Sequence, residues 1–377
     1  MIIGFDAKRA FHNNTGLGNY SRGIIKNLIH FYSENNYVLY TPAHKSLHLH
    51  RELKHNSNLK QIQPPLLWPK ALSALWRSYA IPMSFKREGI ELYHGLSNEL
   101  PSNLPKNIAK IVSIHDLIFM RHPEWYPKVD VHFYKKKFKA ACERADHVIA
   151  ISKQTKTDIE SFFKIKESKI SVIYQSCDPL FYDFNNVAYR NEIISKYNLN
   201  HPFFFYVGSL NARKNVASLI KAFENISDNC EHQLLIAGNG QKTYIELINK
   251  QISELGLQDR ISIFHGIPND DLPALYQLAD IFVYPSSFEG FGIPIIESLY
   301  CRTPVITSEG SCFNETAGEG AIYAKVGDHK DLAEKMLELS QNTNLKSTLA
   351  EKGLKHVQQF HREKTTEHLV SLYKGML

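Results

Sequence analysis

Short apolar runs alternate with helical patterns along the whole chain, and this alternation restricts the fold more than any other feature. The apolar runs cover residues 1–5, 38–40, 92–94, 108–114 and 147–151, and then 203–207, 233–237, 261–264, 281–284, 304–307 and 321–323. Several are apolar on both faces, as buried parallel strands are. Helical patterns lie between them, at residues 20–32, 153–163, 217–226, 244–255 and 272–279. The alternation predicts an α/β fold with two doubly wound, Rossmann-like domains.

The length of the chain also favours two domains. A single core stops growing near roughly 250–300 residues, and this chain has 377. We expect the boundary near residues 178–189, because residues 203–208 have the pattern of the first strand of a new sheet. The predicted first domain is therefore 1–183, and the second begins at residue 184.

Composition excludes several classes of protein. The chain is 43% hydrophobic and 22% charged, which is typical of a soluble globular enzyme and excludes a disordered chain. No apolar run reaches the ~18–20 residues of a membrane span, and the N-terminus does not resemble a signal peptide. The five cysteines form no CxxC pair, and their odd number favours reduced thiols. We therefore expect a cytoplasmic protein.

The charge is unevenly distributed between the two halves. Residues 1–183 contain 26 Lys and Arg against 16 Asp and Glu, a net charge of +10, while residues 184–377 contain 18 against 22, a net charge of −4. The basic half is expected to meet an anionic partner such as a phosphate, a lipid headgroup or a nucleic acid.

Two turns in the first half follow predicted strands. Ligands of such sheets bind at the carboxyl ends of the strands. Gly16 and Gly18 precede the helical pattern at residue 20, and they would let backbone amides approach an anion at a helix start, although a flexible turn is an equal alternative. His115 and Asp116 end an apolar strand. The imidazole could form a hydrogen bond with a substrate hydroxyl, and the carboxylate could fix the tautomer of the imidazole or cap the next segment. Alternatively, both residues could be structural.

Two turns in the second half suggest a phosphate site. Gly208 and Ser209 end a strand, and Arg213 and Lys214 follow just before a helical pattern. Planar and point charges beside a helix start favour a diphosphate. Gly238 lies in a similar turn, where it could admit a nucleobase or simply close the turn.

The most specific segment runs from Glu289 to Glu297. A strand leads into a loop with Gly290 and Gly292, and a helix begins near Pro294. Each carboxylate could hold a sugar diol, because a carboxylate accepts hydrogen bonds from two hydroxyls. Packing alone would not require two glutamates and two glycines here.

Two aromatic and basic segments bear on membranes. Residues 64–87 place Trp68, Leu72, Leu75, Trp76 and Tyr79 at helical spacing among basic residues, and residues 133–139 combine Phe133, Tyr134 and Phe138 with four lysines. Such helices can lie on anionic membranes, or they can cover a sheet with one solvated face.

These motifs resemble the family-4 retaining glycosyltransferases, which have the GT-B fold. The segment EGFGIPIIE matches the E-x7-E signature of that family, GSLNARKN resembles its phosphate-binding stretch, and the TGLG loop with His115-Asp116 matches its N-domain elements. The opening Asp6-Ala7 with TGLGNY is similar to members that transfer mannose. The resemblance implies two Rossmann-like domains facing across a cleft, 1–183 on the acceptor side and 184–357 for the nucleotide sugar, with residues 358–377 as a helix that returns to the first domain.

The resemblance also implies roles for individual residues. Arg213 and Lys214 would neutralise the donor diphosphate, Glu297 would hold the ribose, and Glu289 with the amides of residues 290–292, including Phe291, would hold the transferred sugar. His115 would act near the anomeric carbon, and Gly16, Gly18, Gly208, Ser209 and Gly238 would bring backbone close to the ligands. No metal or other cofactor is expected, and a GDP-sugar is favoured over a UDP-sugar as donor. The implied acceptor is a glycan or a lipid-linked glycan, used in surface polysaccharide synthesis.

Other functions fit parts of these observations. A GT-B synthase with a small soluble acceptor, or a protein that binds nucleotide sugars without turnover, would carry most of the same motifs, and the E-x7-E signature fits an epimerase poorly. A nucleic-acid-binding protein would explain the basic half, but we find no recognised nucleic-acid-binding module and expect no nucleic-acid partner.

Overall fold

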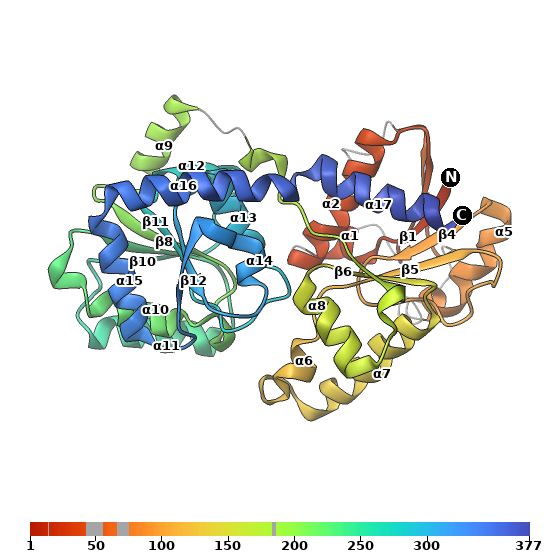
Figure 1. Cartoon of the computed structure of the whole chain (residues 1–377), viewed down its shortest axis with the longest axis horizontal. Helices are drawn as coiled ribbons and strands as arrows, with labels where there is room; N and C mark the ends of the chain where they lie inside the picture. Colours follow the sequence, from red (N-terminus) through yellow and green to blue (C-terminus); the bar gives the residue numbers. More distant parts are fainter. Residues whose placement is uncertain (14, 43–55, 66–74, 183–185) are drawn as a thin grey trace. The chain divides into compact units, whose positions relative to one another are not determined.

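The computed structural model describes residues 1–13, 15–42, 56–65, 75–182 and 186–377 (Figure 1). The described residues form two compact units, Met1–Ser176 with His361–Leu377, and Cys177–Phe360. Each unit has a parallel sheet with helices, and the C-terminal helix belongs to the first unit, as the GT-B fold predicts. No helix within the described ranges is long and apolar enough to cross a bilayer.

The first unit is built on a seven-stranded sheet in the order β3-β2-β1-β4-β5-β6-β7. Its strands are β1 Ile2–Asp6, β2 Asn36–Tyr40, β3 Leu59–Ile62, β4 Leu92–Gly95, β5 Ala109–Ile114, β6 His147–Ala150 and β7 Ile170–Val172. Its α-helices are α1 Lys8–His12, α2 Gly16–Phe31, α5 Phe85–Glu88, α6 Ile118–Arg121, α7 Lys128–Arg144, α8 Lys153–Asp158 and α17 Arg362–Met376. The inner strands are buried on both faces, which explains their continuous apolar runs.

The second unit is built on a six-stranded sheet in the order β10-β9-β8-β11-β12-β13. Its strands are β8 Phe203–Val207, β9 Gln233–Ala237, β10 Ile261–Phe264, β11 Ile281–Tyr284, β12 Val305–Ser308 and β13 Ala321–Ala324. Its α-helices are α9 Val187–Tyr197, α10 Val216–Glu224, α11 Lys242–Glu254, α12 Leu272–Leu278, α13 Ile293–Tyr300, α14 Phe313–Ala317, α15 His329–Gln341 and α16 Thr343–Val357. The strand order reverses between β8 and β11, where open sheets of this kind bind ligands.

One expected helix start was wrong, and two strands of the first sheet were not expected. Helix α2 begins at Gly16 and not at residue 20, so the TGLG segment is its first turn. The helical pattern over residues 153–163 is confirmed, as α8 followed directly by a π-helical turn, Ile159–Phe163. Strands β3 and β7 were not expected; the sequence of β3 has no apolar run, and none of its side chains is fully buried.

Within the described residues, neither of the two aromatic and basic segments forms one continuous apolar stripe. Trp68 and Leu72 lie outside the described residues, while Trp76 is buried and Leu75 and Tyr79 are exposed. On α7, Tyr134 and Phe138 pack against Phe119 and the core, with ring centroids 5.7 and 5.3 Å from that ring. Phe133 is 57% exposed. The described aromatic residues of each segment are therefore divided between core and solvent.

The two glycines at the start of α2 give a matched test of the fold. A Cβ atom at Gly18 would lie 1.7 Å from the Asn13 carbonyl oxygen, whereas nothing lies within 4 Å of a Cβ atom at Gly16. Gly18→Ala should therefore lower the free energy of unfolding by about 1–3 kcal/mol, and Gly16→Ala should leave it within about 0.5 kcal/mol of the wild type. Chemical denaturation of both variants checks this, and equal losses would contradict the helix start described here.

Candidate active site

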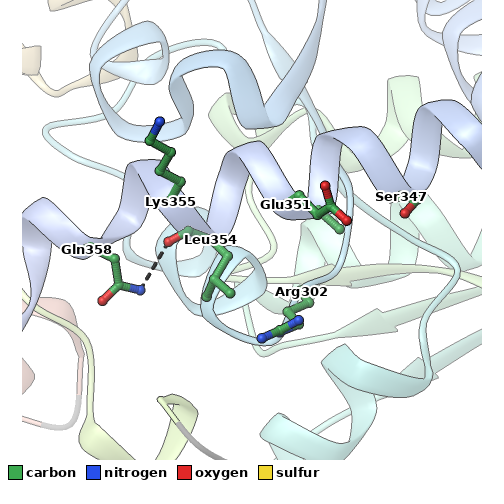
Figure 2. Close-up of a pocket in the computed structure, with 7 residues that line it drawn as sticks. Arg302, Ser347, Glu351, Leu354, Lys355 and Gln358 are labelled. Atoms are coloured by element: carbon green, nitrogen blue, oxygen red, sulfur yellow. Dashed lines mark hydrogen bonds between the residues drawn. The ribbon is translucent and has the colours of Figure 1, made fainter.

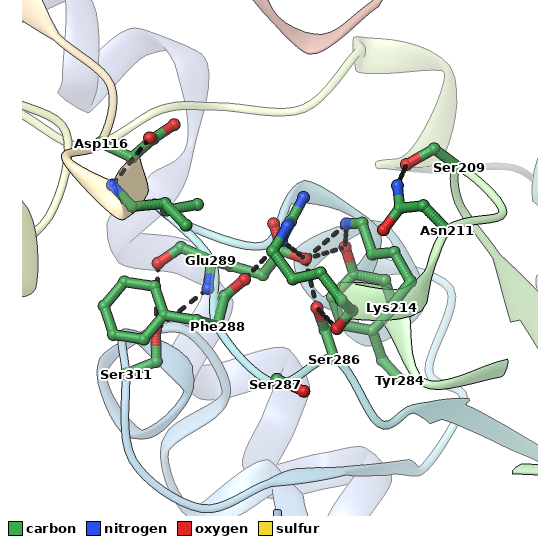
Figure 3. Close-up of polar contacts among 12 residues, drawn as sticks. Asp116, Ser209, Asn211, Lys214, Tyr284, Ser286, Ser287, Phe288, Glu289 and Ser311 are labelled. Atoms are coloured by element: carbon green, nitrogen blue, oxygen red, sulfur yellow. Dashed lines mark hydrogen bonds and ion pairs between the residues drawn. The ribbon is translucent and has the colours of Figure 1, made fainter. Parts of the chain in front are cut away.

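Three charged side chains converge where β8 and β11 end in the second unit. Arg213 and Lys214 lie on a 3-10 turn, Ala212–Lys214, just after β8, and Glu289 lies in the loop after β11. Lys214 Nζ is 2.5 Å and Arg213 Nη1 is 2.7 Å from Glu289 Oε1 (Figure 3). Residues 75 positions apart in the sequence thus meet at the reversal of strand order.

Glu289 is buried and ionised. The side chain of Ser286 donates to Oε1 at 2.5 Å and that of Tyr284 at 3.3 Å, and the residue is 9% exposed. Burial opposes ionisation, but the charges of Lys214 and then Arg213 lower the pKa of Glu289 to about 2. These contacts all go to Oε1; Oε2 accepts no hydrogen bond from the described residues and is not among the buried, unsatisfied atoms. One oxygen therefore holds the cluster together, and the other is left without a hydrogen bond from the described residues.

The loop that carries Glu289 is tied to the segment at the start of α14. Ser311 Oγ donates to the Glu289 carbonyl at 3.0 Å and accepts from its amide at 3.1 Å, and Thr316 Oγ1 donates to the Phe291 carbonyl at 2.7 Å. The Phe291 ring packs on Phe360, with centroids 5.3 Å apart, so only its backbone could face a ligand. Sequence patterns could not identify Ser311 or Thr316, because isolated hydroxyl residues are common in turns.

Glu297 lies on α13, whose N-cap is Gly292 with φ +105°. Its Oε2 accepts a hydrogen bond from the Tyr276 hydroxyl at 2.9 Å, and Oε1 accepts none from the described residues. Burial raises the pKa of Glu297 to about 7, although the bond from Tyr276 acts in the opposite direction. The two glutamates of the signature therefore differ: one is ionised by cations, and the other titrates near neutral pH.

The glycine turns after β8 and β9 pack directly on each other. A Cβ atom at Gly238 would lie 1.8 Å from the Gly208 carbonyl oxygen, and one at Gly240 would lie 2.0 Å from the Leu210 oxygen. This close approach of the two backbones is enough to require a glycine at position 238, whether or not a ligand binds there. It corresponds to the interpretation of the sequence in which Gly238 closes the turn. Ser209 is exposed at the same edge and accepts a hydrogen bond from Asn211.

In the first unit, His115 is buried immediately after β5. Its Nε2 lies 2.9 Å from the Leu96 carbonyl oxygen, which makes Nε2 the protonated nitrogen, and its ring meets Tyr20 of α2 edge-on at 4.6 Å. Burial lowers the pKa of His115 to about 4, so the ring is neutral at pH 7. Asp116 accepts from the Ile118 amide at 3.2 Å and thereby caps the next segment. The Leu96 carbonyl therefore fixes the imidazole tautomer.

A second charged cluster in the first unit was not predicted from the sequence. Asp6, at the end of β1, forms an ion pair with Arg77, and Arg77 also lies 3.1 Å from Glu99, which follows β4. Lys137 Nζ is 2.7 Å from the other oxygen of Glu99. This cluster occupies the reversal of strand order in the first sheet, between β1 and β4. Arg77 and Glu99 have no motif around them, so only the fold could identify them.

A surface hollow of about 570 Å³ lies along α16 in the second unit, and Figure 2 shows the residues that line it. The residues that line it are Arg302, Ser347, Ala350, Glu351, Leu354, Lys355 and Gln358. None of them belongs to the sequence-predicted site.

Comparison with known proteins identifies the family of the chain. Residues 16–179 match a family model described as Glycosyltransferase Family 4, and residues 190–373 match one described as Glycosyl transferases group 1. Over 285 residues the chain is 26% identical to O-antigen chain mannosyltransferase B of Escherichia coli; the match covers 75% of this chain and 74% of that protein. Over 221 residues it is 30% identical to O-antigen chain mannosyltransferase RfbU of Salmonella typhimurium; the match covers 58% of this chain and 57% of that protein.

Solved structures show the same fold. The sucrose-phosphate synthase of Thermosynechococcus elongatus has a TM-score of 0.78 at 20% identity, covering 100% of this chain and 98% of that one. HepE of Anabaena, solved with UDP and glucose, has a TM-score of 0.77 at 17% identity, covering 99% of both chains. The family models, the relatives and the two parallel sheets together lead to one conclusion: the chain belongs to the family-4 glycosyltransferases with the GT-B fold, and it is a hexosyltransferase.

Proposed function

We propose that this enzyme transfers a hexose, with mannose as first choice, from a nucleoside-diphosphate sugar to a glycan or lipid-linked acceptor, with retention of anomeric configuration. A GDP-sugar is the favoured donor, and the reaction serves surface polysaccharide synthesis at the cytoplasmic face of a membrane. The similarity to two O-antigen mannosyltransferases supports the sugar and the acceptor class. The observation that carries the proposal is the convergence of Arg213 and Lys214 on Glu289.

The charge of this cluster suits the leaving group. When the glycosidic bond to the donor breaks, negative charge develops on the departing diphosphate. Arg213 and Lys214 are already fixed by Glu289, so they can stabilise that charge with little reorganisation. Two cations share one carboxylate, which leaves a net positive charge for the phosphates.

The free oxygens of the two glutamates suit the sugars. Glu289 Oε2 would accept a hydroxyl of the transferred sugar, with the backbone of residues 290–292 beside it, and Glu297 Oε1 would accept a ribose hydroxyl. Gly208 and Ser209 would face the phosphates, and His115, with Gly16 and Gly18 at the start of α2, would serve the acceptor side. No carboxylate stands out as a nucleophile, so we favour attack on the same face of the sugar, assisted by the leaving phosphate.

Thermal-shift screening with UDP-, GDP- and ADP-sugars tests the proposal. A donor at 100 times its Kd should stabilise the wild type by about 2.7 kcal/mol.

Arg213→Ala should weaken nucleoside diphosphate binding about tenfold, because a hydrogen bond to a charged group contributes roughly 1.5–3 kcal/mol. Lys221→Ala, an exposed residue of α10, should bind like the wild type. Absence of a shift with every nucleotide sugar would contradict the proposed donor class.

The two glutamates should separate kinetically. Glu289→Gln should lower kcat strongly, because the carboxylate of Glu289 lies where charge changes during the reaction. The affinity for the nucleoside diphosphate should not fall, because loss of the carboxylate frees Arg213 and Lys214 from their internal counter-ion. Glu297→Gln should mainly raise the donor KM. Steady-state kinetics and calorimetry measure both effects, after melting curves have shown that the variants fold. The opposite pattern would reverse the assignment of sugar and ribose.

Donor binding should also depend on pH through Glu297. A ribose hydroxyl donates to the ionised carboxylate, and the pKa of Glu297 in the free protein is about 7. Lowering the pH from 8 to 6 protonates this group and should weaken nucleoside diphosphate binding by up to about tenfold. Glu297→Gln should retain only the smaller pH effect that comes from the phosphates. If calorimetry gave the same pH dependence of nucleoside diphosphate affinity for the wild type and for Glu297→Gln, Glu297 would not belong to the donor site.

We further propose peripheral binding to anionic membranes through α7. Val129 and Phe133 are 79% and 57% exposed, one turn apart, and Lys135 and Lys136 are exposed beside them. Each basic residue near an anionic surface contributes about 1 kcal/mol to the binding free energy. Exposed apolar side chains strengthen the binding further when they insert into the bilayer interface.

Liposome co-sedimentation tests this surface. The wild type should sediment with anionic vesicles at low salt and less at high salt, and the double variant Val129→Ser with Phe133→Ser should sediment several-fold less. Val187→Ser, which removes an exposed valine of the second unit, is the matched control. Wild-type protein that stays in the supernatant with all vesicles would favour the alternative, a small soluble acceptor.

A further inference from the structure

A chain of side-chain hydrogen bonds runs through the interior of the first unit, from the C-terminal helix to β5. Tyr373 lies on α17, His94 on β4, Ser113 on β5 and Tyr20 on α2. The Tyr373 hydroxyl is 2.6 Å from His94 Nδ1, and His94 Nε2 is 2.8 Å from Ser113 Oγ. The same Oγ is 2.8 Å from the Tyr20 hydroxyl. Side chains thus join four elements that are distant from one another in the sequence.

The bonds of this chain depend on one another. All four side chains are buried, so water cannot readily replace a partner that is lost. Burial of the ring lowers the pKa of His94 to about 3, so the imidazole is neutral at pH 7. A neutral imidazole has one donor and one acceptor nitrogen, and the hydroxyls of Tyr373 and Ser113 therefore have opposite roles toward it. Loss of either hydroxyl lets the His94 ring change its tautomer or its orientation.

The chain ends against His115. The rings of Tyr20 and His115 meet edge-on, with centroids 4.6 Å apart, and Ser113 precedes His115 by two residues. The Nε2 of His115 is bonded to the Leu96 carbonyl oxygen, and its Nδ1 accepts no hydrogen bond from the described residues and is not among the buried, unsatisfied atoms. The imidazole can therefore present Nδ1 to a ligand as an acceptor, provided that its orientation is kept.

The backbone of His115 is fixed independently of this chain. Its amide donates to Asn98 Oδ1 at 2.8 Å, and its carbonyl oxygen accepts from Thr155 Oγ1 at 3.2 Å. A broken bond in the chain should therefore disturb the His115 ring while the end of β5 stays in place.

We propose that Tyr373 of the C-terminal helix is a positioning residue for His115 in the transfer reaction. Its hydroxyl acts through the hydrogen-bonded chain, which holds the Tyr20 ring against the imidazole. This inference rests on the role that the proposed function gives to His115. It assigns to α17 a part in the reaction, in addition to its place in the fold of the first unit.

NMR of the histidine ring nitrogens in the native full chain tests the link to His115 without turnover. Tyr373→Phe should move the ring signals of both His94 and His115, which the spectra of His94→Gln and His115→Ala identify. Tyr40→Phe is the matched control, because Tyr40 is a buried tyrosine of the same unit whose hydroxyl bonds Ser84, outside the chain. It should move neither signal. Unmoved His115 signals in Tyr373→Phe would overturn the inference.

Kinetics then test the consequence for the reaction, followed as release of GDP from GDP-mannose. Tyr373→Phe should lower kcat roughly tenfold, because misplacement of a positioned group by about 1 Å can cost up to about 100-fold. Its affinity for GDP in calorimetry should match the wild type, because the proposed phosphate site lies in the second unit. Tyr40→Phe should keep the wild-type kcat, although both variants lose a buried hydroxyl and should melt at a lower temperature. Equal kcat values in the two variants and the wild type would overturn the inference.

A double-mutant cycle shows whether Tyr373 acts through His115. In a His115→Ala background, Tyr373→Phe should cause no further loss of kcat, whereas independent, additive losses would overturn the inference. A His115→Ala variant with the wild-type kcat would contradict both the proposed role of His115 and this inference. A defective His115→Ala beside a fully active Tyr373→Phe would overturn this inference alone. A wild type that does not turn over GDP-mannose would contradict the proposed donor, and the NMR result would still decide the link between Tyr373 and His115.

Discussion

The buried carboxylate of Glu289 is the group on which the second unit depends. An isolated charge at this depth would be costly, because burial removes its hydration. Here one oxygen accepts bonds from Lys214, Arg213, Ser286 and Tyr284, and this set of partners keeps the acid ionised. The same contacts fix the two cations, since Lys214 is 7% exposed and would be equally costly without its partner. The carboxylate and the two cations therefore stabilise one another in this buried cluster.

The order of the strands explains why these residues meet. Strands β8 and β11 are neighbours although β9 and β10 lie between them in the sequence, and both are parallel, so the segments that follow them lie at the same edge. The turns after β8 and β9 are packed backbone to backbone at Gly208 and Gly238, which holds the Arg213 turn in position. The chemistry of the site thus depends on glycines whose own role is explained by packing.

The sequence was sufficient to predict the strands of the second sheet, most strands of the first and the two-unit organisation, and it drew attention to the charged residues that follow β8 and β11. Continuous apolar runs such as 203–207 can only be buried strands in this context, and Arg213, Lys214 and Glu289 follow strands directly. The sequence could not show that these three form one cluster, because ion pairing across 75 residues depends on the sheet order. It also missed Arg77 and Glu99, which follow no motif, and the start of α2, because glycine is a poor helix former and Gly16 and Gly18 were assigned to a turn.

Local charge and net charge point to different parts of the chain. The first 183 residues carry a net charge of +10, yet at the reversal of strand order in the first sheet the cations Arg77 and Lys137 are matched by the carboxylates Asp6 and Glu99. The second half of the chain is acidic overall, but at the corresponding position two cations share the single carboxylate of Glu289. A buried cation acts on a phosphate at short range, whereas exposed lysines act through screened, long-range attraction. The surplus positive charge beside Glu289 therefore suits a bound diphosphate, and the exposed basic residues of α7 suit an extended anionic surface.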